Sequence, residues 1–377
     1  MKLFIASGIF HPEAGGPATY LHELLPELIQ RGWDVRALTY SDTLPADQHF
    51  PYPLTRILRQ SLPIRLLRYA QAARPLLRWA DLVYLHTLGL PLYGDHHARR
   101  VVKIVGDQSW ERSVRRGWIA PNEDIDAFQT RTYGLPVTLD RANRAREARS
   151  MDSIIVPSEY LKRMVVGWGV DPGKVQVIYN ALPPDTVAPQ ITQAEARAHL
   201  NLPDAPTVLT VGRILPWKGV DHLIAALHTL PDIRLIVAGD GATLDQLKAQ
   251  AADLGDRVVF LGRVSREQMP LHMKAADYVA LYSGYEGLSH TLLESLRVGT
   301  PVIASDKGGN PEVVQHGVNG LLVPYVDVEA LALALEQAFR PGLRDSLAAN
   351  SAAGTDRFDF AHMVESTSEA LFRLARN

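Results

Sequence analysis

The stretch YSGYEGLSHTLLESLRVGTPVIASDKGGNPEVV, residues 282–314, joins a glycine-rich turn, a helix-length segment and a short apolar run in immediate succession. HTLLESLRV, residues 290–298, has the apolar spacing of a helix, and PVIAS, residues 301–305, is typical of a buried strand. A turn, a helix and a strand in this order form part of a βαβ unit. The stretch therefore predicts an α/β fold with a parallel sheet.

The same alternation recurs on both sides of this stretch. The strand-like runs are KLFIA, DVRALTY, DLVYLH, VVKIV and SIIVPS in the first half, and TVLTVG, IRLIVAG, RVVFLG, YVALY and PVIAS in the second. Two such series predict two parallel sheets, and the proline-rich segment VIYNALPPDTVAPQITQAEAR between them predicts a linker. We expect domains at residues 1–182 and 183–356, followed by a C-terminal helix at 357–377 that packs back on the first domain.

Composition limits the classes of protein that this chain can be. Its 377 residues exceed what one core usually supports, and 46% hydrophobic with 21% charged residues is typical of a globular protein. The absence of cysteine excludes disulfides, thiolate zinc sites and a cysteine nucleophile, and it favours a reducing compartment. No signal peptide or membrane-spanning run is evident, so we expect a cytoplasmic protein, with no nucleic-acid partner at a net charge of −2.

Cationic and amide groups follow the strands of the second half, where ligands of open α/β sheets bind. VGRILPWKG places Arg213 just after a strand and Lys218 five residues later, so both cations can lie beside one anion. The turn Gly287, Leu288, Ser289 begins a helix whose amide groups can face the same anion, and glycine allows close approach. These features predict a phosphate-binding edge, although an isolated pair of cations with this spacing is more often a solvated loop.

Two carboxylates flank this turn. Glu294 lies among leucines in the helix and is suited to accept hydrogen bonds from vicinal hydroxyls such as those of a ribose. Glu286 precedes the turn and would lie nearer the other end of a nucleotide sugar. The alternative is that either glutamate is a helix-end charge that interacts with the helix dipole.

Together these segments resemble a known family. Glu286 and Glu294 with seven residues between them, VGRILPWKG, VVFLGRV and GTPVIASDKGGNPEVVQHGVNGLLV closely resemble the donor half of retaining glycosyltransferases of family 4, also called glycosyl transferases group 1. The resemblance extends over nearly the whole chain and is looser in the first half. It implies the GT-B architecture, an α/β fold of two facing Rossmann-like domains with an interdomain cleft. The first domain would bind the acceptor and the second the nucleotide-sugar donor.

The resemblance also implies residue roles. Arg213 and Lys218 would bind the diphosphate, Glu294 the ribose, and Glu286 the hydroxyls of the donor sugar. The backbone around Arg263 and Val264 would face the base, and the amides of residues 287–289 would help to hold the donor. Gly15 and Gly16 match the family's glycine-rich loop near the donor phosphates and the acceptor.

The chain departs from the family at one position. Many members carry a histidine after the fourth strand of the first domain, where VVKIVGDQSWE has Gly106 and Asp107. We expect Asp107 to touch the acceptor hydroxyl as a base or orienting group, and therefore count it with Arg213, Lys218 and Glu286 as a catalytic candidate. His86, after the preceding strand, is a weaker acceptor-side candidate that also fits a partly buried structural imidazole.

The expected reaction moves a sugar from a nucleoside diphosphate to an acceptor hydroxyl, with retention of configuration implied by the resemblance. Because no residue is marked as a carboxylate nucleophile, we favour departure and attack on the same face of the sugar. Two cations and helix amides can stabilise the leaving diphosphate, so we expect no metal and no cofactor. Asp124 and Asp126 form an Asp-x-Asp pair, but they do not follow a clear strand and fit a solvated acidic turn better.

Alternative functions remain at this stage. A nucleotide-sugar epimerase would share the architecture, and a non-catalytic module that binds nucleotide sugars would share the site. A dehydrogenase is disfavoured because GIFHPEAGG lacks the G-x-G-x-x-G spacing.

The acceptor is less well defined than the donor. We expect a glycan, lipid-linked or small-molecule acceptor in polysaccharide or glycoconjugate synthesis. The basic stretch 56–78 could form an amphipathic helix that touches the inner membrane face, but an ordinary solvated helix is the favoured interpretation.

Overall fold

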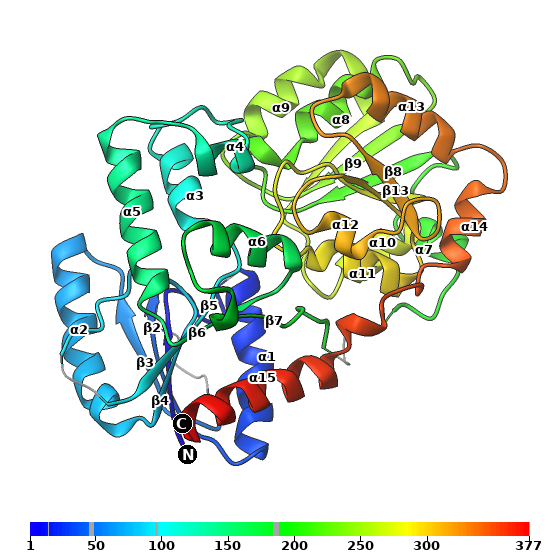
Figure 1. Cartoon of the computed structure of the whole chain (residues 1–377). Coiled ribbons are helices and arrows are strands. Elements are labelled where there is room, and N and C mark those ends of the chain that lie inside the picture. The colour runs from blue at the N-terminus through cyan, green and yellow to red at the C-terminus, as the bar shows by residue number, and fades with distance from the viewer. Residues whose placement is uncertain (14, 45–48, 95–96, 184–187, 377) are drawn as a thin grey trace. The chain divides into compact units, whose positions relative to one another are not determined.

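A computed structural model of the chain describes residues 1–13, 15–44, 49–94, 97–183 and 188–376. The chain forms two compact units, each built on a parallel sheet with helices packed against it (Figure 1). The first unit comprises Met1–Trp118, Gln129–Tyr179 and Phe360–Asn377, and the second comprises Ile119–Phe128 and Asn180–Asp359. Part of the predicted linker, residues 184–187, lies outside the described residues.

The sheet of the first unit has seven strands in the order β3-β2-β1-β4-β5-β6-β7, and all neighbours are parallel. The strands are β1 (Lys2–Ser7), β2 (Asp34–Ser41), β3 (Leu54–Leu58), β4 (Leu82–Leu85), β5 (Arg99–Lys103), β6 (Ser153–Val156) and β7 (Val175–Val177). Its helices are α1 (Gly16–Gln30), α2 (Leu62–Trp79), α3 (Gln108–Arg115), α5 (Leu135–Arg149), α6 (Glu159–Gly167), the 3₁₀ turn η1 (Pro172–Lys174) and α15 (Phe360–Arg376). The short α4 (Ile125–Thr130) crosses a boundary between the units.

The sheet of the second unit has six parallel strands in the order β10-β9-β8-β11-β12-β13. They are β8 (Thr207–Val211), β9 (Arg234–Ala238), β10 (Val258–Gly262), β11 (Tyr278–Leu281), β12 (Val302–Ser305) and β13 (Gly320–Val323). The helices are α7 (Gln193–His199), α8 (Val220–Leu227), α9 (Leu244–Gln250), α10 (Met269–Ala275), α11 (His290–Val298), α12 (Asn310–Val313), α13 (Val328–Ala338) and α14 (Leu343–Ala349). The 3₁₀ segments are η2 (Pro216–Lys218), η3 (Ala252–Arg257) and η4 (Asp356–Phe358).

The predicted fold class of two Rossmann-like parallel sheets is confirmed, and each of the ten strand-like runs contains a strand. The strands β3, β7 and β13 were not predicted, and all three are edge strands. An edge strand has a neighbour on one side only. Residues of β3 are half-buried or exposed, and β7 has only three residues, so neither carries the continuous apolar run of an inner strand.

Local sequence signals explain why the stretch 282–314 folds as a turn, a helix and a strand. The Ser289 side chain accepts a hydrogen bond from the Leu292 amide and caps the start of α11. Gly299 ends the helix in the left-handed conformation, with φ at 82°. All four residues of β12 are buried, as expected for an inner strand of a parallel sheet.

The last helix belongs to the first unit. α15 lies beside α1 (Figure 1), where Tyr20 and Thr367 approach at 3.4 Å and the rings of Trp33 and Phe372 stack at 4.4 Å. Residues 119–128 depart from the expected domain division. They follow α3 in the chain, yet they belong to the second unit.

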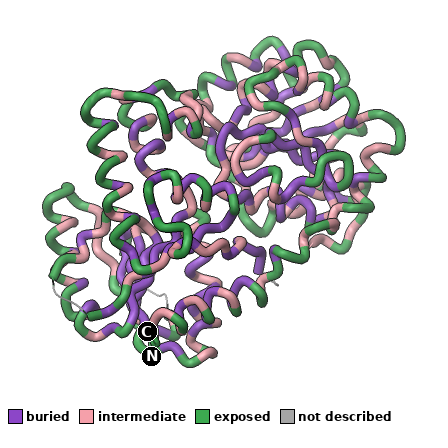
Figure 2. Tube along the Cα trace, viewed as in Figure 1, coloured by how far each residue is buried: buried purple, intermediate pink, exposed green. Residues whose placement is uncertain are grey.

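Buried residues concentrate in the two sheets, whereas outer helix faces are exposed (Figure 2). In the part of the chain that the structure describes, no helix combines the length and the apolar content needed to cross a membrane.

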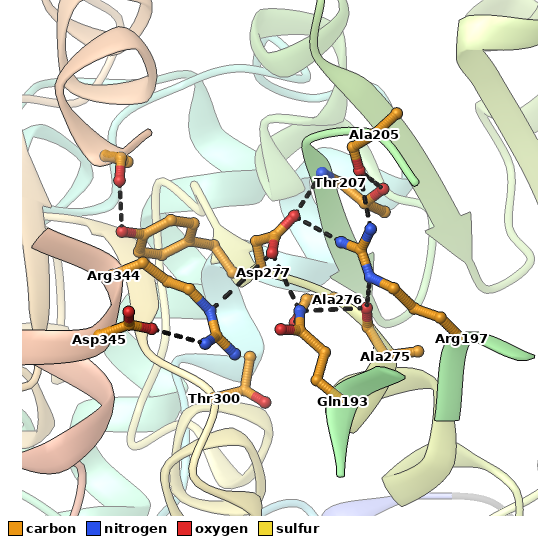
Figure 3. Close-up of polar contacts among 12 residues, drawn as sticks. Gln193, Arg197, Ala205, Thr207, Ala275, Ala276, Asp277, Thr300, Arg344 and Asp345 are labelled. Carbon is orange, nitrogen blue, oxygen red and sulfur yellow. Dashed lines mark hydrogen bonds and ion pairs between the residues drawn. The ribbon is translucent and has the colours of Figure 1, made fainter. Parts of the chain in front are cut away.

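A carboxylate holds together the amino-terminal edge of the second sheet. Asp277, just before β11, accepts hydrogen bonds from Gln193 and Arg197 of α7 and from the Thr207 amide at the start of β8 (Figure 3). The Arg344 side chain of α14 lies 3.9 Å from the same carboxylate. Asp277 thus links two helices and the neighbouring strand β8 through hydrogen bonds and ion pairs at one position of the sheet.

Candidate functional site

The carboxyl edge of the second sheet is built from loops that touch through their backbones. Gly308, with φ at 63°, and Gly309 pack against the backbone of residues 286–288, where a Cβ atom would clash with carbonyl oxygens. The Gly309 amide donates a hydrogen bond to the Glu286 carbonyl at 2.8 Å. The turn after β12 therefore supports the turn after β11.

Lys218 and Glu286 form an ion pair on this edge. The Lys218 Nζ lies 2.5 Å from the Glu286 Oε1, and the two side chains are 18% and 15% exposed. Gly219, with φ at 66°, lets the chain turn directly after Lys218 while its Cα lies against the Tyr282 backbone. Both residues are predicted site residues with separate roles, and the structure brings them into direct contact.

Arg213 lies at the end of β8. The Gly212 amide bonds to the Ala238 carbonyl and the Ile214 amide to the Asp240 carbonyl, which fixes the backbone on both sides of Arg213. The Arg213 side chain is exposed and, among the described residues, makes no ion pair. A fixed backbone with an open guanidinium suits the recruitment of an anion from solvent.

The turn 287–289 leads into α11, whose first turn contains no acidic residue. Leu288 and Ser289 are buried, and Gly287 is half-buried. The Ser289 side chain already accepts the Leu292 amide, but no carboxylate of the same turn offsets the positive dipole end of this nine-residue helix. This end of α11 can receive negative charge from a ligand.

Glu294 lies in the second turn of α11 and is half-buried. Burial raises the pKa of its carboxyl from 4.5 to about 6, and the nearby Arg266 and Arg297 oppose that rise. The carboxylate is thus largely ionised at neutral pH and can accept hydrogen bonds from ligand hydroxyls.

Arg263 and Val264 follow β10, as expected. Arg263 is 84% exposed and its Nε lies 3.2 Å from Asp240, while Val264 is half-buried. The Gly239 amide bonds to the Gly262 carbonyl, so the loops after β9 and β10 are joined.

In the first unit, Gly15 and Gly16 stand at the start of α1, where both are exposed. The first turn of α1 carries no acidic residue and has proline at its second position. Pro17 has no amide hydrogen, and the amides of Ala18 and Thr19 donate to the Gly15 carbonyl, so this turn offers a ligand little beyond the Gly16 amide.

Asp107 is fully buried at the start of α3. Its carboxylate accepts hydrogen bonds from the amides of Ser109 and Trp110, receives the Gln129 side chain at 2.9 Å and forms an ion pair with Arg144. These contacts make Asp107 a helix cap and the centre of a buried charge pair. They give no support to the expected role of a base at the acceptor.

His86 is also buried, between the rings of Tyr84 and Tyr20. Burial, and to a lesser degree the nearby Lys103, holds the pKa of His86 well below 6.5. The imidazole is therefore neutral and enclosed, which fits the structural interpretation of this residue.

Asp124 and Asp126 do not gather with other metal ligands. Within the described ranges, no three His, Asp or Glu side chains form a group that could hold a metal ion. Asp124 instead accepts a hydrogen bond from the Ala127 amide and lies 3.3 Å from the Lys307 Nζ.

Two residues near this edge were not picked out from the sequence. Lys307 directly precedes the glycine pair, and Tyr325 packs its ring where a Cβ of Gly284 would be. The signal that could have indicated Tyr325 is Gly284 itself, since a glycine between two tyrosines after a strand indicates close approach of another group.

Comparison with known proteins gives consistent results for both halves. Residues 14–186 match the family model described as Glycosyltransferase Family 4, and residues 192–353 match the one described as Glycosyl transferases group 1. A D-inositol 3-phosphate glycosyltransferase of Mycolicibacterium gilvum is 36% identical over 225 residues, which cover 57% of this chain and 50% of that protein. A GDP-mannose-dependent alpha-(1-6)-phosphatidylinositol monomannoside mannosyltransferase of Mycobacterium tuberculosis is 36% identical over 180 residues, 44% of this chain and 46% of that protein.

The chain thus spans about half the length of the curated relatives that it matches. Among solved structures, sucrose-phosphate synthase from Thermosynechococcus elongatus superimposes with a TM-score of 0.82 at 24% identity, over 99% of this chain and 98% of that one. Anabaena HepE in complex with UDP-glucose gives a TM-score of 0.72 at 22% identity, over 99% and 100% of the two chains. These likenesses concern the fold. With its two halves matched by the two models in succession, the chain belongs to the family 4-like glycosyltransferases of the GT-B class.

Proposed function

We propose that this protein is a retaining glycosyltransferase that moves a sugar from a nucleoside diphosphate sugar to an acceptor hydroxyl. The observation that carries the proposal is the Lys218–Glu286 ion pair at the carboxyl edge of β11, beside the open start of α11. It places a cation, a carboxylate and helix amides on one short stretch of the sheet edge.

The proposed task of this edge is to stabilise charge. Breaking the bond between the anomeric carbon and the donor phosphate leaves negative charge on the diphosphate. Lys218, Arg213 and the first amides of α11 can take up that charge, since all three lie at the same sheet edge. Lys218 would turn from Glu286 toward the diphosphate, and Glu286 would then be free to bind hydroxyls of the donor sugar.

The remaining donor contacts follow from the same arrangement. Glu294 is proposed to accept hydrogen bonds from the ribose hydroxyls, and the backbone at Arg263 and Val264 to face the base. The acceptor is proposed to bind the first unit, where the start of α1 at Gly15 and Gly16 is exposed. The family relationship supports retention, and we propose that the leaving phosphate helps to deprotonate the acceptor on the same face of the sugar.

The names of similar proteins support a nucleotide-sugar donor. One relative is GDP-mannose-dependent, and one structural neighbour was solved with UDP-glucose. We propose a metal-independent reaction without a cofactor, because protein cations and amides can supply the charge stabilisation. A cytoplasmic setting agrees with the absence of cysteine from the sequence.

A donor screen tests the proposal. The purified chain is incubated with UDP-glucose, UDP-galactose, UDP-N-acetylglucosamine or GDP-mannose, with and without inositol phosphate or simple glycosides, and release of nucleoside diphosphate is measured. Acceptor-dependent release with at least one donor is expected, with equal rates in chelator, and proton NMR of the product should give the donor's anomeric configuration.

Other outcomes would replace the proposal. Interconversion of nucleotide sugars without an acceptor would indicate an epimerase. Binding of nucleotide sugars without turnover under any condition would indicate a binding module, and loss of activity in chelator that manganese restores would overturn metal independence.

A further inference from the structure

A segment from the first half of the sequence contributes to the second unit. Residues 119–128 follow α3, yet they belong to the unit that carries the candidate donor site. Ile125 and Phe128 of this segment are buried. The Asp124 Oδ1 accepts the Ala127 amide at 2.8 Å and so begins α4. The position of the Asp124 carboxylate is thereby fixed by its own backbone.

The other oxygen of Asp124 joins this segment to the turn after β12. The Asp124 Oδ2 lies 3.3 Å from the Lys307 Nζ, and both side chains are about one-third exposed. The pair is accessible to a ligand because neither charge is enclosed.

Lys307 is held close to Glu286 by the backbone. It directly precedes Gly308 and Gly309, which pack against the backbone of Glu286 and Gly287, as described above. On its other side, the Asp306 carboxylate accepts the Tyr325 amide at 3.1 Å. The ammonium group of Lys307 therefore projects from a turn that is fixed at both ends, beside the turn proposed to bind the donor sugar.

Asp124 changes the charge of this region. With Lys307 alone, the turn would present a free cation that attracts an anionic group of a ligand. Paired with Asp124, the cation is balanced, and the carboxylate of Glu286 adds negative charge at the adjoining turn once Lys218 turns from it toward the diphosphate. The pKa of the half-buried Tyr325 is raised by burial first and then by Asp221, Tyr282 and Asp124, so the Asp124 charge reaches the same part of the unit.

Resting on the proposed function, we propose that Asp124 and Lys307 are a specificity pair that makes the donor site select an uncharged sugar over a uronic acid. Hydroxyl groups can donate to Asp124 and accept from Lys307, so a neutral hexose can replace solvent at both. A sugar carboxylate would meet the like charges of Asp124 and Glu286, and the cation that could attract it is already paired.

The test compares UDP-glucose with UDP-glucuronate. Each is read as a donor, or as a competitor against the donor that the wild-type protein prefers. The Asp124→Asn variant keeps a side chain suited to begin a helix but removes the charge, which leaves Lys307 unpaired. The relative preference for UDP-glucuronate should rise about fivefold, the effect of one unit charge about 4 Å away in a water-like medium.

Two further variants make the test specific. Asp126→Asn, an exposed carboxylate of the same segment, is the matched control and should leave the preference unchanged. Lys307→Met added to Asp124→Asn should abolish the gain, because the freed cation is then absent.

An unchanged preference in folded Asp124→Asn, or a wild-type preference for the uronate, would overturn the specificity pair while the proposed function stands. Failure of the wild-type protein to use any nucleotide sugar in the donor screen would instead overturn the proposed function, and the pair with it.

Discussion

Two carboxylates stand at opposite ends of the same strand and differ in what they contact. Asp277 precedes β11 and Glu286 follows it, and their side chains are almost equally exposed, at 16% and 15%. Asp277 receives Gln193, Arg197 and the Thr207 amide, with Arg344 close by (Figure 3). Among the described residues, the carboxylate of Glu286 contacts only Lys218.

Burial alone therefore does not distinguish a structural carboxylate from a functional one. The acceptor positions of Asp277 are used by the protein, so it can offer little to a ligand. Glu286 retains acceptor capacity, and its one partner is a flexible lysine that can turn away.

The largest effect is expected at the cations. Lys218→Ala and Arg213→Ala should each lower turnover at saturating donor by about 100- to 1,000-fold, because each removes stabilisation gained as the donor bond breaks. Steady-state rates of nucleoside diphosphate release provide the measurement. Lys248→Ala, which alters an exposed lysine of the same unit, is the control and should keep the wild-type rate. Near-normal turnover in both site variants would remove the diphosphate assignment.

At the other end of β11, the effect should be on stability. Asp277→Asn should lower the free energy of unfolding in urea by about 2 kcal/mol, because an amide cannot accept all the hydrogen bonds of the carboxylate. Turnover of the folded protein should stay close to normal. Asp253→Asn, at an exposed carboxylate paired with His228, should change stability by less than about 0.5 kcal/mol. If Asp277→Asn proved as stable as this control, the network in Figure 3 would not contribute to the stability of the fold.

A smaller, pH-dependent effect is expected at Glu294. The ionised carboxyl accepts hydrogen bonds from ribose hydroxyls more strongly than the protonated form, so the Michaelis constant for the donor should fall as pH rises through about 6 and level off above it. Glu294→Gln should raise that constant severalfold, with less effect on turnover, and should remove the pH dependence. A larger loss in turnover than in donor affinity would mean that the roles of Glu286 and Glu294 have been exchanged.

Ionisation of the Glu294 carboxyl should favour donor binding but lower the stability of the folded protein. Its folded pKa is raised, so the folded protein binds more protons than the unfolded chain between pH 4.5 and about 6. The free energy of unfolding of the wild-type protein should therefore fall as pH rises from 4.5 to about 6. The fall should be smaller in Glu294→Gln. Urea unfolding at several pH values would measure it, and identical pH profiles would contradict the assigned pKa.

We expect that the protein does not bind to membranes. The exposed surface of α2 carries Leu62, Ile64 and Leu67 beside Arg68 and Arg74, but this apolar strip is short. The protein should sediment equally little with anionic and neutral vesicles. Binding to anionic vesicles alone, lost when Arg68 and Arg74 are changed to Glu, would show that the helix contacts lipid.

The sequence predicts the strands of both sheets and the positions that follow them, because inner strands of parallel sheets are continuous apolar runs. Arg213 and Glu286 follow from this rule, whereas Lys218 and Glu294 follow from their spacing in the turn and helix beyond the strands. The contact between Lys218 and Glu286 was not, since it joins residues 68 positions apart and depends on how two loops pack.

Asp107 shows more clearly that contacts between distant residues depend on the tertiary structure. An aspartate before a helix is a common cap, and that signal was available in the sequence. Its buried partner Arg144 lies 37 residues away on another helix, so the ion pair needed the tertiary structure. The place of residues 119–128 in the second unit could not be predicted either, because sequence order assigns them to the first domain.

The most direct test of the central contrast is Glu286→Gln, measured for turnover at saturating donor and for thermal unfolding on the same preparation. Turnover should fall by about 100-fold or more while the melting temperature stays within about 2 °C of wild type. Wild-type turnover, or a loss of stability like that expected for Asp277→Asn, would contradict it.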